Sequence, residues 1–580
     1  MSGQPGNGPS ETGAHPTAGR GTESASSAGS ASPAGARALS FLERRSALLL
    51  LALLAVGTLR IVLTYRVFNH TIDEPAHIAC GMEWLSKGVY RYETQHPPLA
   101  RVAAALGLYL EGVRTIGRPD MYDEGVDLLY AHNHYDLHLS LARLGVLPFF
   151  WLAAGAVYLW AKRGFGPAAA VLATFFFTFL PPILAHAGLA TTDMALTGTL
   201  TAAFLAMWVW LERPTAPYAV VFGLMGALAV LSKFSSLFYF AAAAGVSAVA
   251  FWRWNRPADI FSAARARARS LGTSVAALVL LTGAFYRFTF GEPGKGWPPI
   301  PLPELFQGVY VVLGHHYRGH PAYLLGQYSE TGWWYYYLVA LAVKTPLPLL
   351  VLAGLGAVWM WRRRRSGVRW WLPLVFSGVI VVGASFGRIH IGVRHILPVY
   401  VGMSIAAAVA TLHLLDRAKR ARWAGWAVGA LLVWYAGSSL AAHPDYLAYF
   451  NFLAGERPER IIVDSDLDWG QDMKRLARRL RELGAREVTF TPVIVADLEA
   501  RHGFPPVKPM DPFEPSPGWN AVSITMLKVF RLGLGRDGAG IALWPERIEP
   551  AERVGKGVLL YYFPPGGQDR LRPSAPRESR

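Results

Sequence analysis

Residues 44–74 are RRSALLLLALLAVGTLRIVLTYRVFNHTIDE, and this stretch defines the class of fold. After the arginine pair, about 20 mostly apolar residues continue to Tyr65, which is enough to cross the hydrocarbon core of a bilayer. No small-residue cleavage site follows the run, so we expect a retained first transmembrane helix rather than a signal peptide. Asp73 and Glu74 come next, just beyond this predicted span.

Further apolar runs bring the predicted number of transmembrane helices to about eleven. They lie at 141–161, 167–186, 193–211, 217–233, 235–252, 271–290, 336–360, 371–387, 395–413 and 424–442. Composition agrees with a membrane protein, because 52% of residues are hydrophobic and only 16% are charged, against about 25% charged in soluble proteins. The fold class that we predict is mainly α: a polytopic membrane protein with short helices in a long first outer loop.

The excess of basic residues fits the topology of such a protein. The net charge is +17, and short cytoplasmic loops are enriched in Lys and Arg. An N-terminus inside the cell places the basic segments 162–163, 253–269, 362–365 and 417–422 on the cytoplasmic side. Binding to nucleic acid is therefore not needed to explain the charge.

Three regions follow from composition. Residues 1–40 are Gly, Ser, Ala, Pro and Thr with few large apolar residues, and we expect them to be disordered. Residues 41–442 form the membrane region, with the outer loop 66–140 included. Residues 443–580 are expected to form a small soluble α/β domain outside the cytoplasm, with strands at 460–464 and 487–490 and an amphipathic helix at 471–483.

The first outer loop carries two adjacent carboxylates, Asp73 and Glu74. A carboxylate beside a low-dielectric boundary suits a general base or a metal ligand. Asp73 also precedes Glu74-Pro75 in the manner of a helix N-cap. The two interpretations are compatible, because a cap fixes the position of a carboxylate.

Other ionisable residues lie in or beside the apolar runs, where charge is costly and marks function by default. His96 precedes the Pro97-Pro98 turn, where it is either an ordinary loop residue or a cation at the membrane surface. The remaining residues of this kind are Asp193, Lys233, Arg287, Lys344, Arg388 and Arg394. Snorkelling of helix-end side chains is the alternative explanation for them.

Carboxylates and cations on one outer face suggest chemistry on a lipid-linked phosphosugar. Arg binds phosphate with a bidentate fork, and carboxylates suit a base or a divalent metal ion. The sequence has no P-loop, zinc-protease or serine-hydrolase motif in a suitable context, so no nucleotide cofactor is expected. The single cysteine, Cys80, excludes a Cys-rich metal site. The acidic run from Asp464 does not match a calcium loop, since its sixth position is Trp469 and its twelfth is Arg475.

Several segments together resemble the bacterial family 39-type glycosyltransferases of the integral-membrane GT-C class. This group is related to the protein O-mannosyltransferases and to the aminoarabinose transferase of lipid A. The resemblance covers about residues 41–480 and is carried by Asp73-Glu74, His96-Pro97-Pro98-Leu99, Thr192-Asp193, Gly332 to Tyr336 with Lys344-Thr345-Pro346, Gly392 to Pro398, and Asp464 to Asp472.

The resemblance implies a polyprenyl-phosphate-sugar donor used at the outer face of the bacterial inner membrane. It implies that Asp73 is the catalytic base or metal-site carboxylate, that Glu74 supports it, and that Asp193 is the second carboxylate. His96 stands where relatives in the aminoarabinose branch have a donor-binding Lys. Phosphate contacts are then expected from Arg394, with Arg388 and Lys344. A divalent ion on Asp73 and Asp193 is compatible with this set.

The function expected from the sequence is transfer of the sugar to an envelope acceptor (a lipid, glycan or protein) by inverting displacement. The tail does not resemble the sugar-binding repeats of eukaryotic O-mannosyltransferases, so protein O-mannosylation is not implied. Two other classes stay open at this stage: a polytopic transporter, which would favour inverted halves and midplane charges, and a non-catalytic envelope assembly protein, which would need no pocket at Asp73.

Overall fold

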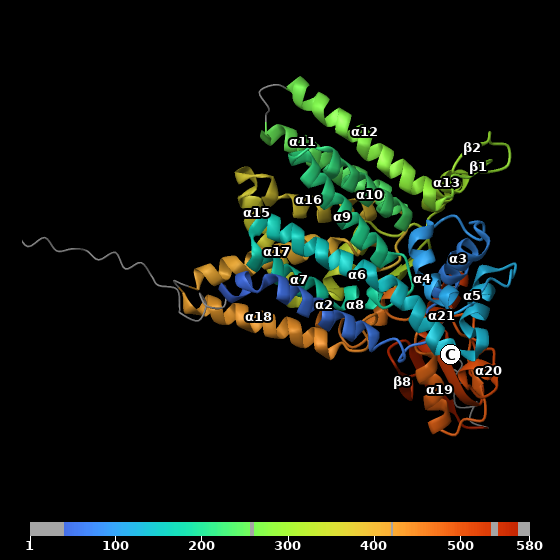
Figure 1. Ribbon diagram of the computed structural model, residues 1–580. Coiled ribbons are helices and arrows are strands. Elements are labelled where there is room, and N and C mark those ends of the chain that lie inside the picture. Colours follow the sequence, from blue (N-terminus) through green and yellow to red (C-terminus); the bar gives the residue numbers. More distant parts are fainter. Residues whose placement is uncertain (1–39, 256–259, 419–420, 535–542, 566–580) are drawn as a thin grey trace, which may run out of the picture.

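A computed structural model describes residues 40–255, 260–418, 421–534 and 543–565. The described chain is mainly helical, and its apolar helices form one elongated bundle (Figure 1). The bundle helices are α2 (Ser46–Val62), α6 (Tyr135–Phe165), α7 (Pro167–Thr178), α8 (Pro181–Ala187), α9 (Asp193–Glu212), α10 (Ala216–Ser232), α11 (Ser235–Asn255), α12 (Ile260–Phe285), α14 (Tyr336–Lys344), α15 (Leu347–Arg362), α16 (Leu372–Ser385), α17 (Val399–Arg417) and α18 (Arg422–Ala441).

Among the described residues, five helices are long and apolar enough to span a membrane: Tyr135–Phe165, Asp193–Glu212, Arg267–Phe285, Val399–Arg417 and Arg422–Ala441. The bent pair α7 and α8 makes a sixth if it counts as one span. Six further apolar helices have 10–17 residues. A mainly helical membrane protein is therefore confirmed, whereas the predicted number of about eleven spans is not.

Proline explains two differences from the predicted spans. The run at 167–186 is divided at Pro181-Pro182, and its two helices are bent by 67°. The run at 336–360 is divided at Pro346, where α14 ends and α15 begins. Proline lacks the amide that would continue the helix, and it disfavours helical geometry in the preceding residue.

The bundle core is filled by large aromatic side chains from helices far apart in sequence. Trp160 of α6 stacks on Phe204 of α9 with ring centroids 5.2 Å apart, and it meets Phe376 of α16 edge-on at 5.4 Å. Trp160 is completely buried. Such contacts hold α6, α9 and α16 together, and α9 begins at Asp193, which pairs with a residue of the cavity described below.

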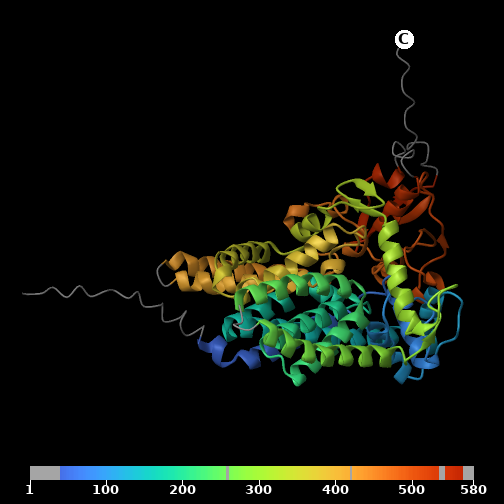
Figure 2. The same ribbon diagram turned by 90° about the horizontal axis from the view of Figure 1, so that it is seen from above.

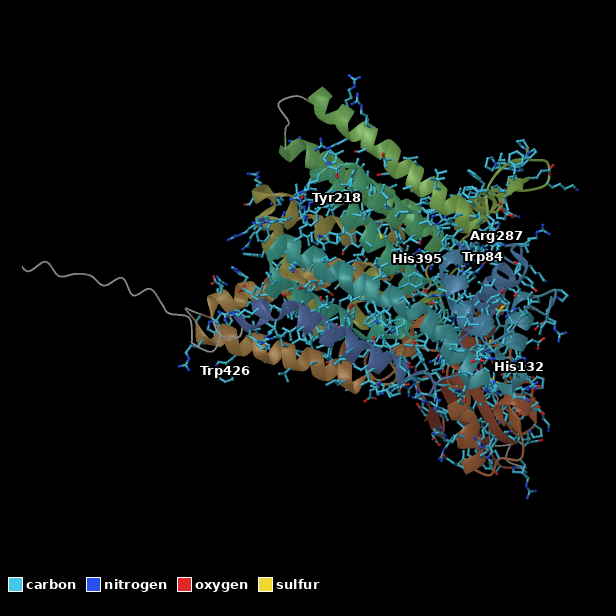
Figure 3. The ribbon with its side chains drawn as sticks, in the orientation of Figure 1. Trp84, His132, Tyr218, Arg287, His395 and Trp426 are labelled. Carbon is cyan, nitrogen blue, oxygen red and sulfur yellow. The ribbon has the colours of Figure 1, made fainter. Side chains whose placement is uncertain are left out.

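The first outer loop and the segment after α12 cover one end of the bundle. The loop forms α3 (Glu74–Lys87), α4 (Pro98–Leu110) and α5 (Met121–Tyr130). The later segment forms α13 (Pro303–Arg318) and two hairpins, β1 (Phe290–Gly291) with β2 (Ile300–Pro301) and β3 (Ala322–Leu324) with β4 (Gln327–Ser329). Figure 2 shows α13 crossing this end of the bundle. At the edge of this region the Arg287 guanidinium lies over the Trp84 ring, 4.5 Å from its centroid, and so ties α12 to α3 (Figure 3).

The tail lies at the same end and contains a mixed sheet of order β6-β5-β7-β9-β8 in its described part. The strands are β5 (Val488–Thr489), β6 (Val507–Lys508), β7 (Gly518–Ser523), β8 (Glu552–Val554) and β9 (Val558–Phe563). β5 pairs in parallel with β6 and β7, and the other pairs are antiparallel. The helices of this part are α19 (Met473–Glu482), α20 (Leu498–His502) and α21 (Ile524–Gly533).

Two of the three elements predicted in the tail are present, and one is wrong. α19 matches the predicted helix at 471–483, and β5 matches the strand at 487–490. Residues 460–464 form no strand. They lie between the short 3₁₀ turns Pro458–Arg460 and Asp464–Asp466, and Asp464 has a φ of 67°, a left-handed conformation that a strand does not contain.

Candidate active site

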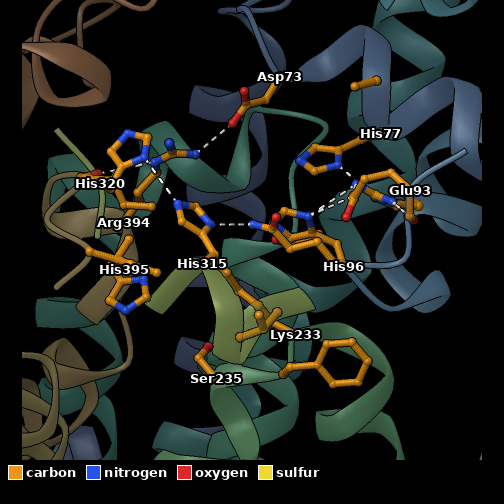
Figure 4. Close-up of a pocket in the computed structure, with 18 of the residues that line it drawn as sticks. Asp73, His77, Glu93, His96, Lys233, Ser235, His315, His320, Arg394 and His395 are labelled. Atoms are coloured by element: carbon orange, nitrogen blue, oxygen red, sulfur yellow. Dashed lines mark hydrogen bonds and ion pairs between the residues drawn. The ribbon is translucent and has the colours of Figure 1, made fainter. Parts of the chain in front are cut away.

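A cavity of about 300 Å³ opens where the outer loop, α13 and the bundle meet. Its walls come from the start of α3, the 93–101 turn, α13, the α10–α11 turn and the segment before α17. Figure 4 shows polar side chains from all of these elements facing one another. Three residues predicted from the sequence line it: Asp73, His96 and Arg394.

Asp73 faces the cavity and pairs with Arg394. It stands at the N-cap position of α3, but its carboxylate makes no capping hydrogen bond to the described backbone. Instead it accepts a hydrogen bond from Arg394 Nη1 at 2.9 Å (Figure 4). The Asp73 side chain is 28% exposed and the Arg394 side chain 12%. The start of α3 thus positions the Asp73 carboxylate, and this carboxylate pairs with Arg394 instead of capping the helix.

Arg394 is held by two more contacts. Its Nε donates to the Ile391 carbonyl at 3.3 Å, and its guanidinium lies over the Trp469 ring, 4.2 Å from the centroid. Burial lowers the pKa of Arg394, but Asp73, Asp193 and Asp464 outweigh burial and raise it. The guanidinium therefore stays charged in a partly buried site.

A second ion pair lies beside the first. Lys233, on the turn between α10 and α11, lines the cavity and donates to Asp193 Oδ1 at 2.6 Å. Asp193 is the first residue of α9 and is only 1% exposed, so it lies behind Lys233 rather than on the cavity wall. The sequence singled out Lys233 as a costly charge, and the structure adds it to the site.

His96 belongs to a network on the outer-loop wall. Its Nδ1 lies 3.1 Å from Glu93 Oε2, and Arg101 also bonds that carboxylate oxygen. Burial would raise the pKa of Glu93, but Arg101 and His96 reverse the shift and hold it well below its usual range. Glu93 is thus ionised, and its other oxygen, Oε1, is buried without a partner among the described residues.

Two histidines that the sequence did not indicate line the opposite wall. His315 Nδ1 lies 3.0 Å from Gln95 Nε2, and His315 Nε2 lies 3.4 Å from His320 Nδ1 (Figure 4). Burial lowers the pKa of both histidines, and each is further affected by neighbouring charges. Both are therefore neutral near pH 7. Neither lies in a segment with a recognisable motif, so only the arrangement of α13 reveals them.

The structure does not bring Glu74 to the cavity. Its carboxylate is completely buried and accepts hydrogen bonds from Arg143 Nε and Nη2, both at 2.9 Å. It also accepts from the amides of Thr71 at 2.8 Å and Ala190 at 2.9 Å. Burial raises the pKa of Glu74, but Arg143 and these amides bring it below its usual value. Glu74 therefore ties the outer loop to α6 and to the segment before α9.

Lys344 and Arg388 are also placed away from the cavity wall. Lys344 is 1% exposed and donates to the carbonyls of Leu447 at 2.7 Å and Asp466 at 2.6 Å. Arg388 is exposed and donates to the Tyr317 carbonyl at 2.9 Å. Their contacts connect segments that surround the site.

The acidic loop of the tail reaches the site. Ser465 Oγ donates to the Ile391 carbonyl at 2.9 Å, and the Val393 amide donates to both carboxylate oxygens of Asp466 at 3.3 Å. The Ile72 amide donates to the Trp469 carbonyl at 3.2 Å. One loop thus contacts the backbone beside both Arg394 and Asp73.

Asp73 and Asp193 do not form a fitting site for a divalent metal ion. Each carboxylate is paired with a cation, and Asp193 is not on the cavity wall. Among the described residues, no group of three or more His, Cys, Asp or Glu side chains is arranged to hold a metal. Divalent ions in proteins take several oxygen or nitrogen ligands. Here Arg394 and Lys233 already pair with the two carboxylates that would have to bind the ion.

The sequence matches no protein-family model and no curated protein. Some solved structures align with much of the chain. ArnT from Cupriavidus metallidurans, bound to undecaprenyl phosphate, aligns with a TM-score of 0.49 and 14% identity over 88% of this chain and 97% of that chain. The oligosaccharyltransferase AglB from Archaeoglobus fulgidus, in complex with an inhibitory peptide and a dolichol-phosphate, gives 0.41 and 13% over 80% of this chain and 61% of that chain. Both alignments extend over most of this chain, at identities of 13–14%.

Proposed function

We propose that the protein is an integral-membrane glycosyltransferase that moves a sugar from a polyprenyl-phosphate carrier to an envelope acceptor. The observation that supports this most is the cavity where the Asp73–Arg394 pair and the Lys233 ammonium meet. A carboxylate open to solvent and two cations suit a reaction that removes a proton on one side and releases a phosphate on the other.

In the proposed reaction, an acceptor hydroxyl attacks the anomeric carbon of the lipid-linked sugar. The bond from that carbon to the acceptor oxygen forms while its bond to the phosphate oxygen breaks, with inversion. The hydroxyl proton goes to the Asp73 carboxylate. The bond electrons go to the phosphate, which leaves as a polyprenyl phosphate monoester with one more negative charge.

Arg394 and Lys233 are the proposed phosphate ligands. Both line the cavity and both are already oriented by a carboxylate. Interactions that strengthen as charge develops on the leaving group accelerate the reaction. Asp193 then positions Lys233 from behind, and His96 lines the same cavity. No step requires a metal ion.

The alternative of a transporter is less favoured by the placement of charge. The paired groups lie at the first turn of α9, at the start of α3 and on the α10–α11 turn. Element ends of this kind suit chemistry at a membrane surface, whereas transporter sites lie near the middle of the bilayer. We therefore propose a multi-pass enzyme of the bacterial inner membrane that works at its outer face.

The test uses the purified full chain with a polyprenyl-phosphate sugar and an extract of envelope lipids and glycans that supplies the acceptor hydroxyl, and release of polyprenyl phosphate is measured. Asp73→Asn is expected to fold normally and to lower turnover by about 10²–10⁴, the usual effect of losing a general base. Asp123→Asn is the matched control, because Asp123 is an exposed carboxylate of the same outer loop that does not line the cavity. Turnover at the wild-type level in Asp73→Asn would refute the proposed role of this carboxylate.

The acceptor and the sugar are identified in cells. Mass spectrometry of envelope lipids and glycans is compared between cells with the gene, cells without it, and cells that carry Asp73→Asn. The proposal expects the same sugar to be missing in the last two. Unchanged envelope glycosylation in cells lacking the gene would contradict a role in that process.

A further inference from the structure

Helix α13 presents an apolar face to the outside of the molecule. Four large side chains on this face are between 49% and 79% exposed: Phe306, Tyr310, Leu313 and Tyr317. They recur every three or four residues and therefore form one stripe along the helix, called here the apolar stripe. Nothing in the proposed reaction uses it. We propose that the apolar stripe lies in the headgroup region of the bilayer, in the leaflet on the side of the candidate active site.

The opposite face of α13 is the one that packs on the protein. A Cβ on Gly308 would lie 2.3 Å from the Thr94 carbonyl oxygen and 2.5 Å from the Phe234 ring, so the helix backbone is in close contact there. Val312 and His315, on the same side as Gly308, line the cavity. A surface helix of a soluble protein turns its apolar side inward. An apolar side turned outward marks an interaction surface.

The apolar stripe continues the lipid-facing surface of α12. The part of α12 at Arg267–Phe285 is long and apolar enough to span a membrane, and only 22% of its apolar stretch is buried within the protein. The exposed Phe288 ring then folds back on this helix, since a Cβ on Gly283 would lie 2.4 Å from it. Thr289 Oγ1 donates to Glu304 Oε2 at 2.7 Å, which ties the first turn of α13 to the end of α12.

The β1–β2 hairpin extends the same surface. Trp297, between the two strands, is exposed, and its ring meets the Tyr310 ring edge-on with centroids 6.1 Å apart. Phe290 of β1 is also exposed. Trp and Tyr are enriched where a membrane meets water, because each combines an apolar ring with a polar N–H or O–H group. The composition of the surface therefore favours lipid headgroups over a protein partner.

Arginines border the apolar stripe. The Arg388 guanidinium lies over the Tyr317 ring, 5.9 Å from its centroid, and donates to the Tyr317 carbonyl at 2.9 Å. Arg318, in the last turn of α13, is exposed. Basic side chains beside an apolar face are typical of helices that lie on a membrane, where they reach the headgroups. This placement accounts for Arg388, which the sequence singles out and the cavity does not use.

The direction of α13 agrees with a helix on the membrane surface. Figures 1 and 2 show it beside the C-terminal end of α12 and across the helices of the bundle. Since the bundle helices cross the membrane, a helix that runs across them lies along its surface. Helices of this kind bury their apolar face about 5–10 Å into the boundary between headgroups and acyl chains. In this arrangement α13 contacts lipid with one face and lines the cavity with the other.

The test measures the depth of a spin label on the apolar stripe. Cys80 is the single cysteine of the chain and is buried, so a cysteine added at the surface can be labelled selectively. Leu313→Cys is labelled in the full chain in phospholipid nanodiscs. Electron paramagnetic resonance then gives the collision rates of the label with oxygen, which concentrates in lipid, and with a water-soluble nickel chelate. The proposal expects the ratio of oxygen to nickel collisions to be several times that of a label in water.

Three labelled variants are the controls. Val529→Cys gives the value in water, because Val529 is an apolar residue of α21 in the tail and is 46% exposed, against 49% for Leu313. Val279→Cys, on the exposed side of α12, gives the value in lipid. Gln307→Cys is an exposed position of α13 outside the apolar stripe. The Leu313 ratio should lie between the water and lipid values, and the Gln307 ratio should lie nearer the value in water.

Three outcomes would overturn the proposal. Equal ratios for the Leu313 and Val529 labels would place the apolar stripe in water. Low collision rates of the Leu313 label with both reagents would mean that protein covers it, such as a second copy of the chain. Equal ratios for Leu313 and Gln307 would mean that α13 does not lie with this face on the membrane. None of these measurements depends on turnover, so their failure is separate from failure of the proposed reaction.

Discussion

Arg394 joins three parts of the chain through one side chain. Its guanidinium bonds Asp73 of the outer loop, contacts the Ile391 carbonyl of its own segment and covers Trp469 of the tail. A lysine at this position would keep the charge but would lose the planar fork that makes these contacts together. The shape of the side chain is therefore as important as its charge.

We predict that Arg394→Lys lowers turnover by on the order of 10², the size of the effect of losing one preorganised group that stabilises developing charge. The measurement is kcat and KM for the polyprenyl-phosphate sugar, with thermal unfolding as a check on the fold. Arg388→Lys is the matched control, because Arg388 is exposed and bonds Tyr317 outside the cavity. Normal kcat in Arg394→Lys with a lowered melting temperature would make Arg394 a structural residue.

Glu74 illustrates the opposite case, a carboxylate beside the site whose contacts are all structural. We predict that Glu74→Gln destabilises the protein by about 3–5 kcal/mol, because it leaves the buried Arg143 charge without its partner. Thermal unfolding measures this, and activity per folded molecule should stay normal. Glu111→Gln, at an exposed position of the same loop, is the control. A well-folded but inactive Glu74→Gln protein would instead place Glu74 in the catalytic machinery.

The residues that sequence reasoning identified in the cavity share one property: each stands in a motif at an element end. Asp73, His96 and Arg394 are of this kind. His315 and His320 could not be identified, since they become neighbours of Gln95 only when α13 crosses the end of the bundle. Lys344 and Arg388 are predicted because charge is costly near a membrane, and Glu74 because it adjoins Asp73. In the structure backbone carbonyls accept from the two cations, and Arg143 pairs with Glu74.

At the scale of elements, the short segment before α17 depends on the tail. Gly392 has a φ of 82°, and a Cβ at this position would lie 2.6 Å from Asp466 Oδ2. The adjacent Val393 amide donates to that same carboxylate. Only glycine allows the loop of the tail to approach the backbone this closely. The tail thus fixes the backbone that carries Arg394.

We predict that Gly392→Ala lowers kcat about tenfold or more, because the loop or the Arg394 segment must move to accommodate the methyl group. Gly326→Ala is a matched control. Gly326 has a φ of 85°, so alanine meets the same backbone cost there, but its Cβ would have no atom within 4 Å. Equal kcat values for the two variants would show that contact with Asp466 does not position the site.

The elements themselves could be predicted where local sequence dominates. Apolar runs predict the bundle helices, and a basic amphipathic pattern predicts α19. The strand expected at 460–464 is absent because two short 3₁₀ turns and the left-handed Asp464 take its place, and the loop that follows is held by distant backbone amides, as Asp466 is by Val393 and Asp468 by Thr525 at 3.2 Å. Such long-range bonds leave no periodic pattern in the local sequence.

At the scale of the molecule, the two ends of the bundle differ in character. The candidate active site, the outer loop and the tail sheet gather at one end, and the C-terminal ends of α11, α15 and α17 gather at the other (Figures 1 and 2). The second end carries the arginines of 362–365. Basic loops of this kind stay on the cytoplasmic side, so the difference between the ends predicts an orientation.

The orientation decides on which side of the membrane the donor is used, and it can be measured with reporters. We predict that alkaline phosphatase fused at the C-terminus is active and that a green fluorescent protein fused there is dark, because this end lies outside. The same reporters fused after Arg365, in a chain truncated at that residue, should give the reverse result. The truncated fusion is the internal control, since it reports the opposite end of the same bundle.

The side on which the tail lies also fixes the side of the reaction. The amide of Ile72 donates to the Trp469 carbonyl in the tail, and Asp73 is the next residue, so the tail and the cavity must share one side. A fluorescent C-terminal fusion would therefore place Asp73, Arg394 and the whole reaction in the cytoplasm, where the acceptor could not be an envelope component.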